Sequence, residues 1–173
     1  MPFTPFHFGP SAVVGLPLSR HLDPFTFVLA SVAIDLEPLS VMVLHLHYPL
    51  HGYAHTFLGA ALVGPVWGIS VWLCRGVLRP ILRDGFKIPF MPSKRKMILS
   101  GVVGMWFHVL LDAPLYTDIK PFYPFHANSL YGLVGHGTMY WFCALCFIPA
   151  AGLYLYGALR ADPQHHAKRK PNR

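Results

Sequence analysis

The feature that most constrains the fold is a long apolar run in the middle of the chain. No residue from Thr56 to Cys74 is charged, and a helix of this length can cross a hydrocarbon core of about 30 Å. Gly59, Gly64 and Gly68 recur along the run, and small residues let membrane helices approach one another closely. The run therefore predicts a membrane-spanning helix.

Three further segments complete a predicted all-α membrane bundle of about four membrane-embedded helices. A second span is expected from Met97 to about Leu115, and a third from Leu130 to Leu159. The segment Pro24–Leu50 is apolar but interrupted, which predicts one helix, a break near Pro38 and a second helical piece. Ahead of it, Ser11–Leu18 predicts a short extra or re-entrant helix.

Composition and charge distribution favour a membrane protein and argue against a nucleic-acid partner. Charged residues make up 12% of the chain, whereas soluble domains carry about 25%. The net charge of +7 would suit a nucleic-acid surface. However, all of the 14 Lys and Arg residues except Arg20 and Lys120 lie in the stretches 75–96 and 160–173, each after an apolar run. This is the pattern of cytoplasmic flanks of membrane helices, so membrane lipids are the expected contacts.

The chain is expected to form one membrane-embedded domain over residues 1–160, followed by a basic, flexible cytoplasmic tail over 161–173. A bacterial or archaeal cytoplasmic membrane is the predicted location. Cys143 and Cys146 form a C-x-x-C pair, but they lie in a predicted span with no second pair nearby. They are therefore predicted to be buried small apolar residues rather than a redox or metal site.

Ionisable residues are unusually frequent in or beside the predicted membrane segments. They are Asp35, Glu37, Asp112 and Asp118, together with His45, His47, His51, His55, His108, His126 and His136. Each such group is unfavourable at membrane depth unless it is paired or hydrated. Coordination of a metal ion satisfies neutral imidazoles and ionised carboxylates together, which makes a metal site the leading hypothesis.

The spacing of these residues predicts which of them act as metal ligands. His51 and His55 are four residues apart and would share one face of a helix, and His108 and Asp112 have the same spacing. Both pairs lie towards the non-cytoplasmic side in the charge-derived orientation. Asp35 and the N-terminal His7 can join them. The predicted ligands are His7, Asp35, His51, His55, His108 and Asp112.

The other histidines have simpler interpretations. His45 and His47 alternate in a way that suits the membrane interface, and His136 can hydrogen-bond neighbouring helices. His21, His165 and His166 are expected to be ordinary surface residues.

Five short motifs follow one another over residues 4–125. They are Thr4-Pro-Phe-His7, Ile34-Asp35-Leu-Glu37-Pro38, His51-Gly-Tyr-Ala-His55-Thr56, Phe107-His108-Val-Leu-Leu-Asp112 and Pro121-Phe-Tyr-Pro124-Phe125. In order and spacing they resemble the YdjM-like membrane-bound metal-dependent hydrolases, which are distantly similar to zinc-dependent phospholipase C. The chain departs from that pattern at Ile34, at Glu37 and at Gly52, which stands where the family has arginine. The last difference removes a cation that could bind substrate.

The resemblance implies a hydrolase with a divalent metal, zinc by analogy. We expect a mono- or dinuclear centre at the non-cytoplasmic interface, where a metal-activated water attacks an ester or phosphoester. A lipid headgroup would be the natural substrate at that depth. Glu37 and Asp118 are the candidate catalytic residues, each as a general base or as a carboxylate that orients a ligand.

Two alternatives belong to other functional classes. The chain could be a non-catalytic accessory subunit of a larger membrane complex, whose aromatic residues contact pigments, lipids or partner membrane proteins. It could also line a proton or ion pathway. The second alternative is weaker, because ionisable groups gathered towards one face do not form a continuous relay.

Overall fold

The computed structural model describes residues 5–88, 90 and 92–161, and all of its regular elements in this part of the chain are helical. The α-helices are α1 (Phe8–Gly15), α2 (Pro24–Ala33), α3 (Leu36–Val43), α4 (Phe57–Leu73), α5 (Arg75–Pro80), α6 (Lys94–Asp112) and α7 (His136–Ala161). Single helical turns lie at η1 (Pro5–His7), η2 (Pro17–Arg20), η3 (Tyr53–His55) and η4 (Ile81–Gly85). The all-α prediction is confirmed, and the predicted tail lies outside the described residues except for Ala161.

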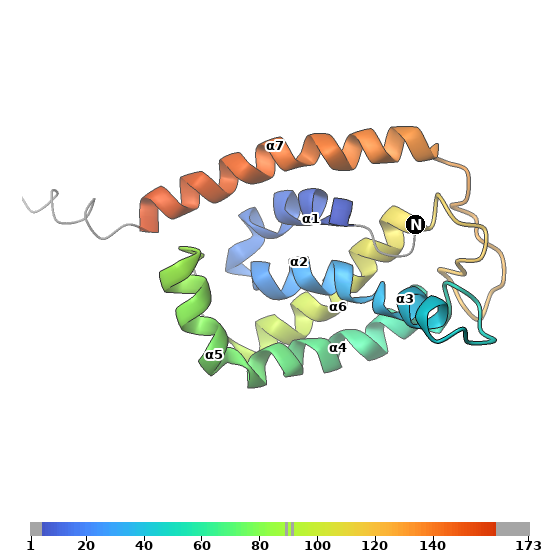
Figure 1. The fold of residues 1–173 in the computed structure, drawn as a ribbon, viewed down its shortest axis with the longest axis horizontal. Helices are drawn as coiled ribbons and strands as arrows, with labels where there is room; N and C mark the ends of the chain where they lie inside the picture. Colours follow the sequence, from blue (N-terminus) through green and yellow to red (C-terminus); the bar gives the residue numbers. More distant parts are fainter. Residues whose placement is uncertain (1–4, 89, 91, 162–173) are drawn as a thin grey trace, which may run out of the picture.

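Helices α1 and α2 lie between α7 on one side and α4 with α6 on the other (Figure 1). The closest packing is between α4 and α6, and it depends on glycines. A Cβ on Gly101 would lie 2.1 Å from the Gly64 carbonyl oxygen, and one on Gly68 would lie 2.3 Å from the Met97 carbonyl oxygen. The contact that the glycines of the apolar run predicted is thus present at Gly64 and Gly68.

Helices α4 and α6 pack antiparallel to each other. Gly64 lies opposite Gly101, whereas the later Gly68 lies opposite the earlier Met97. The N-terminal end of α4 therefore lies beside the C-terminal end of α6, where Trp106 Nε1 donates a hydrogen bond to the Phe57 carbonyl at 2.8 Å. The residues just before α4 and the last turn of α6 consequently meet.

The interruption of the first apolar segment lies at Ile34 and Asp35, before the position expected from Pro38. Proline has no N–H, so Pro38 cannot bond to the Ile34 carbonyl four residues earlier. That carbonyl accepts instead from the Glu37 N–H at 3.1 Å, and the helix restarts at Leu36. The break leaves Asp35 between the two helices, with its side chain buried.

Two helical stretches, Pro24–Val43 and His136–Arg160, are long and apolar enough to cross a membrane. The bent pair Phe57–Leu73 and Arg75–Gly85, whose two parts meet at 68°, would add at most one more among the described residues. Helix α6 is not one of them, because three basic residues open it and Asp112 ends it. Length and composition thus indicate membrane association, while the predicted span over Met97–Leu115 is not confirmed.

Helix α7 begins six residues after the predicted start of its span at Leu130, because turns fill residues 130–135. Gly132 has φ +79° there, a left-handed conformation that favours glycine. The helix packs on α1 and η1, and its remaining surface is apolar and exposed. Of the cysteine pair, Cys143 is buried against Leu111 and Cys146 is half-buried.

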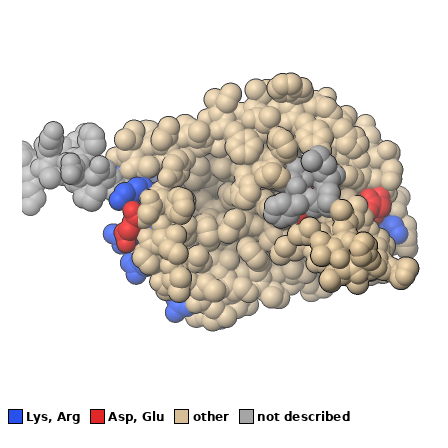
Figure 2. Space-filling model, in the orientation of Figure 1, with Lys and Arg blue, Asp and Glu red and all other residues tan. Residues whose placement is uncertain are grey.

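Charge is concentrated at the two ends of the molecule. Figure 2 shows Lys and Arg gathered, with acidic atoms among them, at the end where Figure 1 places α5, and basic and acidic atoms side by side at the opposite end. The basic end includes Arg79, Arg83 and Lys87, which are exposed. The C-terminal end of α6 lies at the other end.

Candidate metal centre

Five buried side chains converge at the C-terminal end of α6, and we call this cluster the buried centre. Asp35 comes from the α2–α3 break, His7 from η1, His55 from η3, and His108 and Asp112 from α6. None of these residues is more than 3% exposed. Their potential ligand atoms form two groups of three, His7–His108–Asp112 and Asp35–His55–His108, each with all atoms within 4.8 Å of one another. His108 is common to both groups.

His108 is held with one ring nitrogen on the backbone and the other directed at two carboxylates. Its Nδ1 lies 2.6 Å from the Ser31 carbonyl oxygen, so this nitrogen carries the proton and donates. Its Nε2 lies 3.2 Å from Asp35 Oδ1 and 3.2 Å from Asp112 Oδ2. The predicted i, i+4 pairing with Asp112 on one helix face is confirmed.

His55 is oriented in the same manner by a carboxylate. Its Nδ1 donates to Glu37 Oε2 at 2.8 Å, which leaves Nε2 3.6 Å from Asp35 Oδ1. Directly after it, the Thr56 hydroxyl accepts from the Gly59 N–H at 2.8 Å and caps α4. The Nε2 atoms of His55 and His108 are both buried and without a hydrogen-bond partner, although buried polar groups are nearly always satisfied.

His7 closes the buried centre from the N-terminal side, as expected. Its Nε2 lies 3.2 Å from Asp112 Oδ1, while His108 lies at the other oxygen of the same carboxylate. Its ring packs edge-on against that of His108, with centroids 4.5 Å apart. One carboxylate therefore joins two histidines that are far apart in the sequence.

His51 is close to the buried centre but belongs to neither group of three. The prediction that it shares a helix face with His55 is wrong, because the chain around it forms a bend followed by the single turn η3. The N–H groups of Gly52 and Ala54 donate to Glu37 at 3.2 and 3.1 Å rather than to carbonyls of a helix. The loop nevertheless brings the His51 and His55 rings to 4.9 Å.

A carboxylate also orients His51. Asp118 accepts from its backbone N–H at 3.1 Å and from Nδ1 at 3.0 Å, which leaves Nε2 available to another partner. Burial, and then the neighbouring His55, hold the pKa of His51 below its ordinary value, so the neutral imidazole is favoured. Glu37 and Asp118 therefore each contact the Nδ1 of one histidine, the arrangement that orients metal-bound histidines in proteins.

The separations in the buried centre match those between ligands of one ion. Two ligand atoms at about 2.0–2.1 Å from a tetrahedral zinc are separated by roughly 3.3–3.4 Å, and the contacts of His108 and His55 with Asp35 are 3.2 and 3.6 Å. If His108 Nε2 carried a proton, it could donate to the two aspartates. His55 Nε2 would then still lack a hydrogen-bond partner. One cation among these atoms would satisfy both nitrogens and both carboxylates, so these residues could hold a metal ion.

The histidines that were not predicted as ligands belong to neither group of three among the described residues. His21, His45 and His47 are exposed, and His136 is exposed with its ring 6.1 Å from that of Tyr116. His165 and His166 lie outside the described residues.

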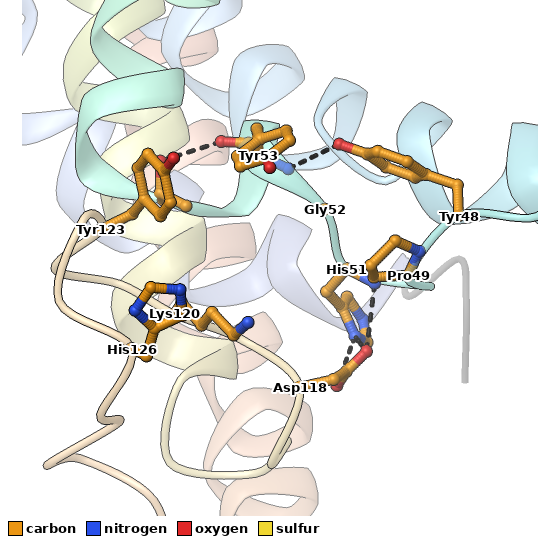
Figure 3. Close-up of a pocket in the computed structure, with 10 residues that line it drawn as sticks. Tyr48, Pro49, His51, Gly52, Tyr53, Asp118, Lys120, Tyr123 and His126 are labelled. Carbon is orange, nitrogen blue, oxygen red and sulfur yellow. Dashed lines mark hydrogen bonds and ion pairs between the residues drawn. The ribbon is translucent and has the colours of Figure 1, made fainter.

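Sequence reasoning missed two parts of this region. The Ser31 carbonyl that orients His108 is a backbone group, for which no sequence signal exists. The second is a cavity of about 260 Å³ on the outer side of His51 (Figure 3). It is lined by Tyr48, Pro49, His51, Gly52, Tyr53, Thr56, Asp118, Lys120, Tyr123 and His126. The motifs His51–Thr56 and Pro121–Phe125 contain five of these residues, but they did not predict that the residues enclose a cavity together with Lys120.

Comparison with family models, with curated proteins and with solved structures gave no match. The likeness to YdjM-like hydrolases consequently rests on the five motifs, and it stays a prediction.

Proposed function

We propose that this protein is a membrane-bound metal-dependent hydrolase whose catalytic ion is held by His55, His108, Asp35 and Asp112. The observation that carries the proposal is the pair of buried Nε2 atoms of His55 and His108, which lack hydrogen-bond partners and face two carboxylates. Zinc is the proposed metal, because nitrogen and carboxylate ligands at these separations suit it. His7, whose Nε2 contacts Asp112 Oδ1, completes the site.

The proposed reaction is hydrolysis of an ester or phosphoester. A metal in such a site lowers the pKa of a bound water and polarises the bond to be cleaved. The water oxygen bonds to the carbonyl carbon or phosphorus, the bond to the leaving oxygen breaks, and the water proton ends on the released alcohol. His51, which lines the cavity and whose Nδ1 is held by Asp118, is the proposed proton acceptor through its other ring nitrogen. Glu37 holds His55 in place.

The proposed setting is a bundle of about four membrane-embedded helices in a bacterial or archaeal cytoplasmic membrane. Helix α6 would lie inside the bundle, where α2 and α4 cover it, and the buried centre would open at the non-cytoplasmic face. The basic end with Arg79, Arg83 and Lys87 supports this orientation. Membrane lipids are proposed partners, and an apolar groove of about 730 Å³ between α1, α2 and α7 suits acyl chains.

Metal analysis of the detergent-purified protein tests the proposal. We expect about one or two divalent ions per chain, lost in His108→Ala and retained in His136→Ala, whose histidine is exposed at the same end. The metal-loaded protein should hydrolyse para-nitrophenyl esters or phosphoesters, and chelation should abolish the activity. Metal content well below one ion per chain, unaffected by His108→Ala, contradicts the proposal.

The accessory-subunit alternative is supported by the surface of α7, where Trp141 and Ile148 are 70% and 71% exposed. Such a surface suits lipid tails or partner membrane proteins equally well. Co-purification of the metal-free chain in a defined complex, without hydrolytic activity, would favour this alternative over the hydrolase.

A further inference from the structure

The cavity beside His51 contains a cation that the buried centre does not use. Lys120 lines this cavity, and its exposed side chain forms no ion pair with a carboxylate of the described residues. In Figure 3 its ammonium end points from the side of His126 towards the space in front of His51 and Asp118. Arg and Lys residues otherwise gather at the opposite end of the molecule (Figure 2).

The backbone that carries Lys120 is fixed on both sides. Ile119 is completely buried, and the Pro121 carbonyl accepts from the Phe57 N–H at 2.9 Å, at the start of α4. Asp118 and Lys120, on either side of Ile119, both line the cavity.

Asp118 is the other charged group of the cavity, and hydrogen bonds from a neutral His51 leave its negative charge in place, but its carboxylate is directed at His51 and forms no ion pair with Lys120 among the described residues. That carboxylate accepts from both the backbone N–H and the Nδ1 of His51. The other walls are the phenol rings of Tyr48, Tyr53 and Tyr123, whose neighbouring centroids lie 6.2 and 5.1 Å apart. The ammonium of Lys120 is thus the charged group of the cavity that lacks a partner.

The size of the cavity limits what can enter. Its volume of about 260 Å³ is just below the range of about 300–1,000 Å³ typical of pockets for drug-sized ligands. It suits a small headgroup rather than a whole lipid. An anionic group in the cavity would contact Lys120 on one side and His51 on the other. The His51 ring in turn lies beside the His55 ring of the buried centre.

We propose that Lys120 binds the anionic oxygen of a phosphoester, so that the protein hydrolyses phosphodiesters in preference to neutral carboxyl esters. This inference rests on the proposed hydrolase function and selects between the two substrate classes left open there. In the reaction, water oxygen bonds to phosphorus, one phosphorus–oxygen ester bond breaks, and the proton passes to the released alcohol. A free phosphodiester and a phospholipid headgroup present the same anionic group to Lys120.

The test compares two chromogenic substrates with the same leaving group, bis(para-nitrophenyl) phosphate and para-nitrophenyl butyrate. In Lys120→Met, which keeps the aliphatic stem, the KM for the phosphodiester should rise about 10- to 100-fold, as expected for loss of a charge-assisted hydrogen bond. Inhibition by inorganic phosphate should weaken by a similar factor. Activity on the butyrate should stay within about twofold, and Lys120→Arg should restore most of the phosphodiester affinity.

Lys87→Met is the matched control, because it removes an exposed lysine at the other end of the molecule. An unchanged phosphodiester KM in Lys120→Met, equal losses on both substrates, or the same loss in Lys87→Met overturns the inference while the hydrolase proposal stands. Phosphatidylglycerol vesicles serve as a third substrate: cleavage there identifies the lipid headgroup as the source, and cleavage of the soluble diester alone identifies a free phosphoester. Lys120→Met should impair whichever is cleaved.

A protein that hydrolyses none of these substrates contradicts the proposed function, and the anion site is then decided by binding alone. Phosphate affinity measured by calorimetry should fall about 10-fold or more in Lys120→Met and stay unchanged in Lys87→Met. Equal affinities in the wild type and Lys120→Met would overturn the anion site as well.

Discussion

His108 on α6 and Ile148 on α7 lie on two long apolar helices of one chain, yet the first is fully buried and the second is 71% exposed. Helix α6 is covered by α2 and α4 and directs ionisable groups inward, whereas α7 contacts α1 and η1 and turns an apolar surface outward. In water, both the exposed apolar surface of α7 and the buried ionisable groups of α6 would be unfavourable. It becomes favourable where lipid covers α7 and a cation occupies the buried centre.

The largest expected effect comes from removing the residue shared by both ligand groups. His108→Ala leaves Asp35 and Asp112 facing each other without a cation or an imidazole between them, which should cost about 3–5 kcal/mol of folding free energy. Thermal unfolding in detergent measures this, and His136→Ala should cost less than about 0.5 kcal/mol. Equal losses in the two variants would contradict a special role for the buried centre.

The glycine contact between α4 and α6 should come next. Gly101→Ala places a Cβ against the Gly64 carbonyl, and such overpacking should cost about 1–3 kcal/mol. The same substitution at Gly157 on α7, where no atom lies within 4 Å of the added Cβ, should be neutral or stabilise by about 0.5–1 kcal/mol. The opposite signs, measured by thermal unfolding, would sharpen the contrast between the packed helix α6 and the exposed apolar helix α7.

Glu37 tests whether a carboxylate outside the proposed ligand set affects metal binding. Glu37→Ala removes the acceptor for His55 Nδ1 and for the Gly52 and Ala54 N–H groups. Metal affinity should fall about 10- to 100-fold, as measured by competition with a chelator. Glu37→Gln keeps an acceptor oxygen and should lose less. Unchanged affinity in Glu37→Ala would mean that the loop positions His55 without this carboxylate.

The smallest effect is expected on the exposed face of α7. Ile148→Ser removes an apolar side chain that contacts little of the protein, so unfolding in detergent should change by less than about 0.5 kcal/mol. A larger loss would indicate that Ile148 is buried in an interface between copies or with a partner, which size-exclusion chromatography of both variants can establish.

The helical fold and the pairing of His108 with Asp112 follow from residue patterns of short range, because these two residues are four apart on one helix. Asp35 lies at the interruption of the first apolar segment. His55 joins the buried centre for a different reason from the helical spacing with His51 that predicted it. The helix expected around His51 is absent, because Glu37 captures the N–H groups of that loop from another segment. The span predicted over Met97–Leu115 is not confirmed, because α6 begins with three basic residues, Lys94 to Lys96, and ends at Asp112.

The sequence by itself determined that this chain is helical, partly lipid-compatible and rich in ionisable groups inside apolar segments, since these properties depend on composition and local spacing. Only the tertiary structure decided which of those groups meet. The antiparallel contact of Gly64 with Gly101 brings the loop before α4 to the last turn of α6, and the break before Pro38 turns Asp35 towards His108. Such meetings depend on helix packing over long sequence separations, as does the placement of Lys120 in the cavity beside His51.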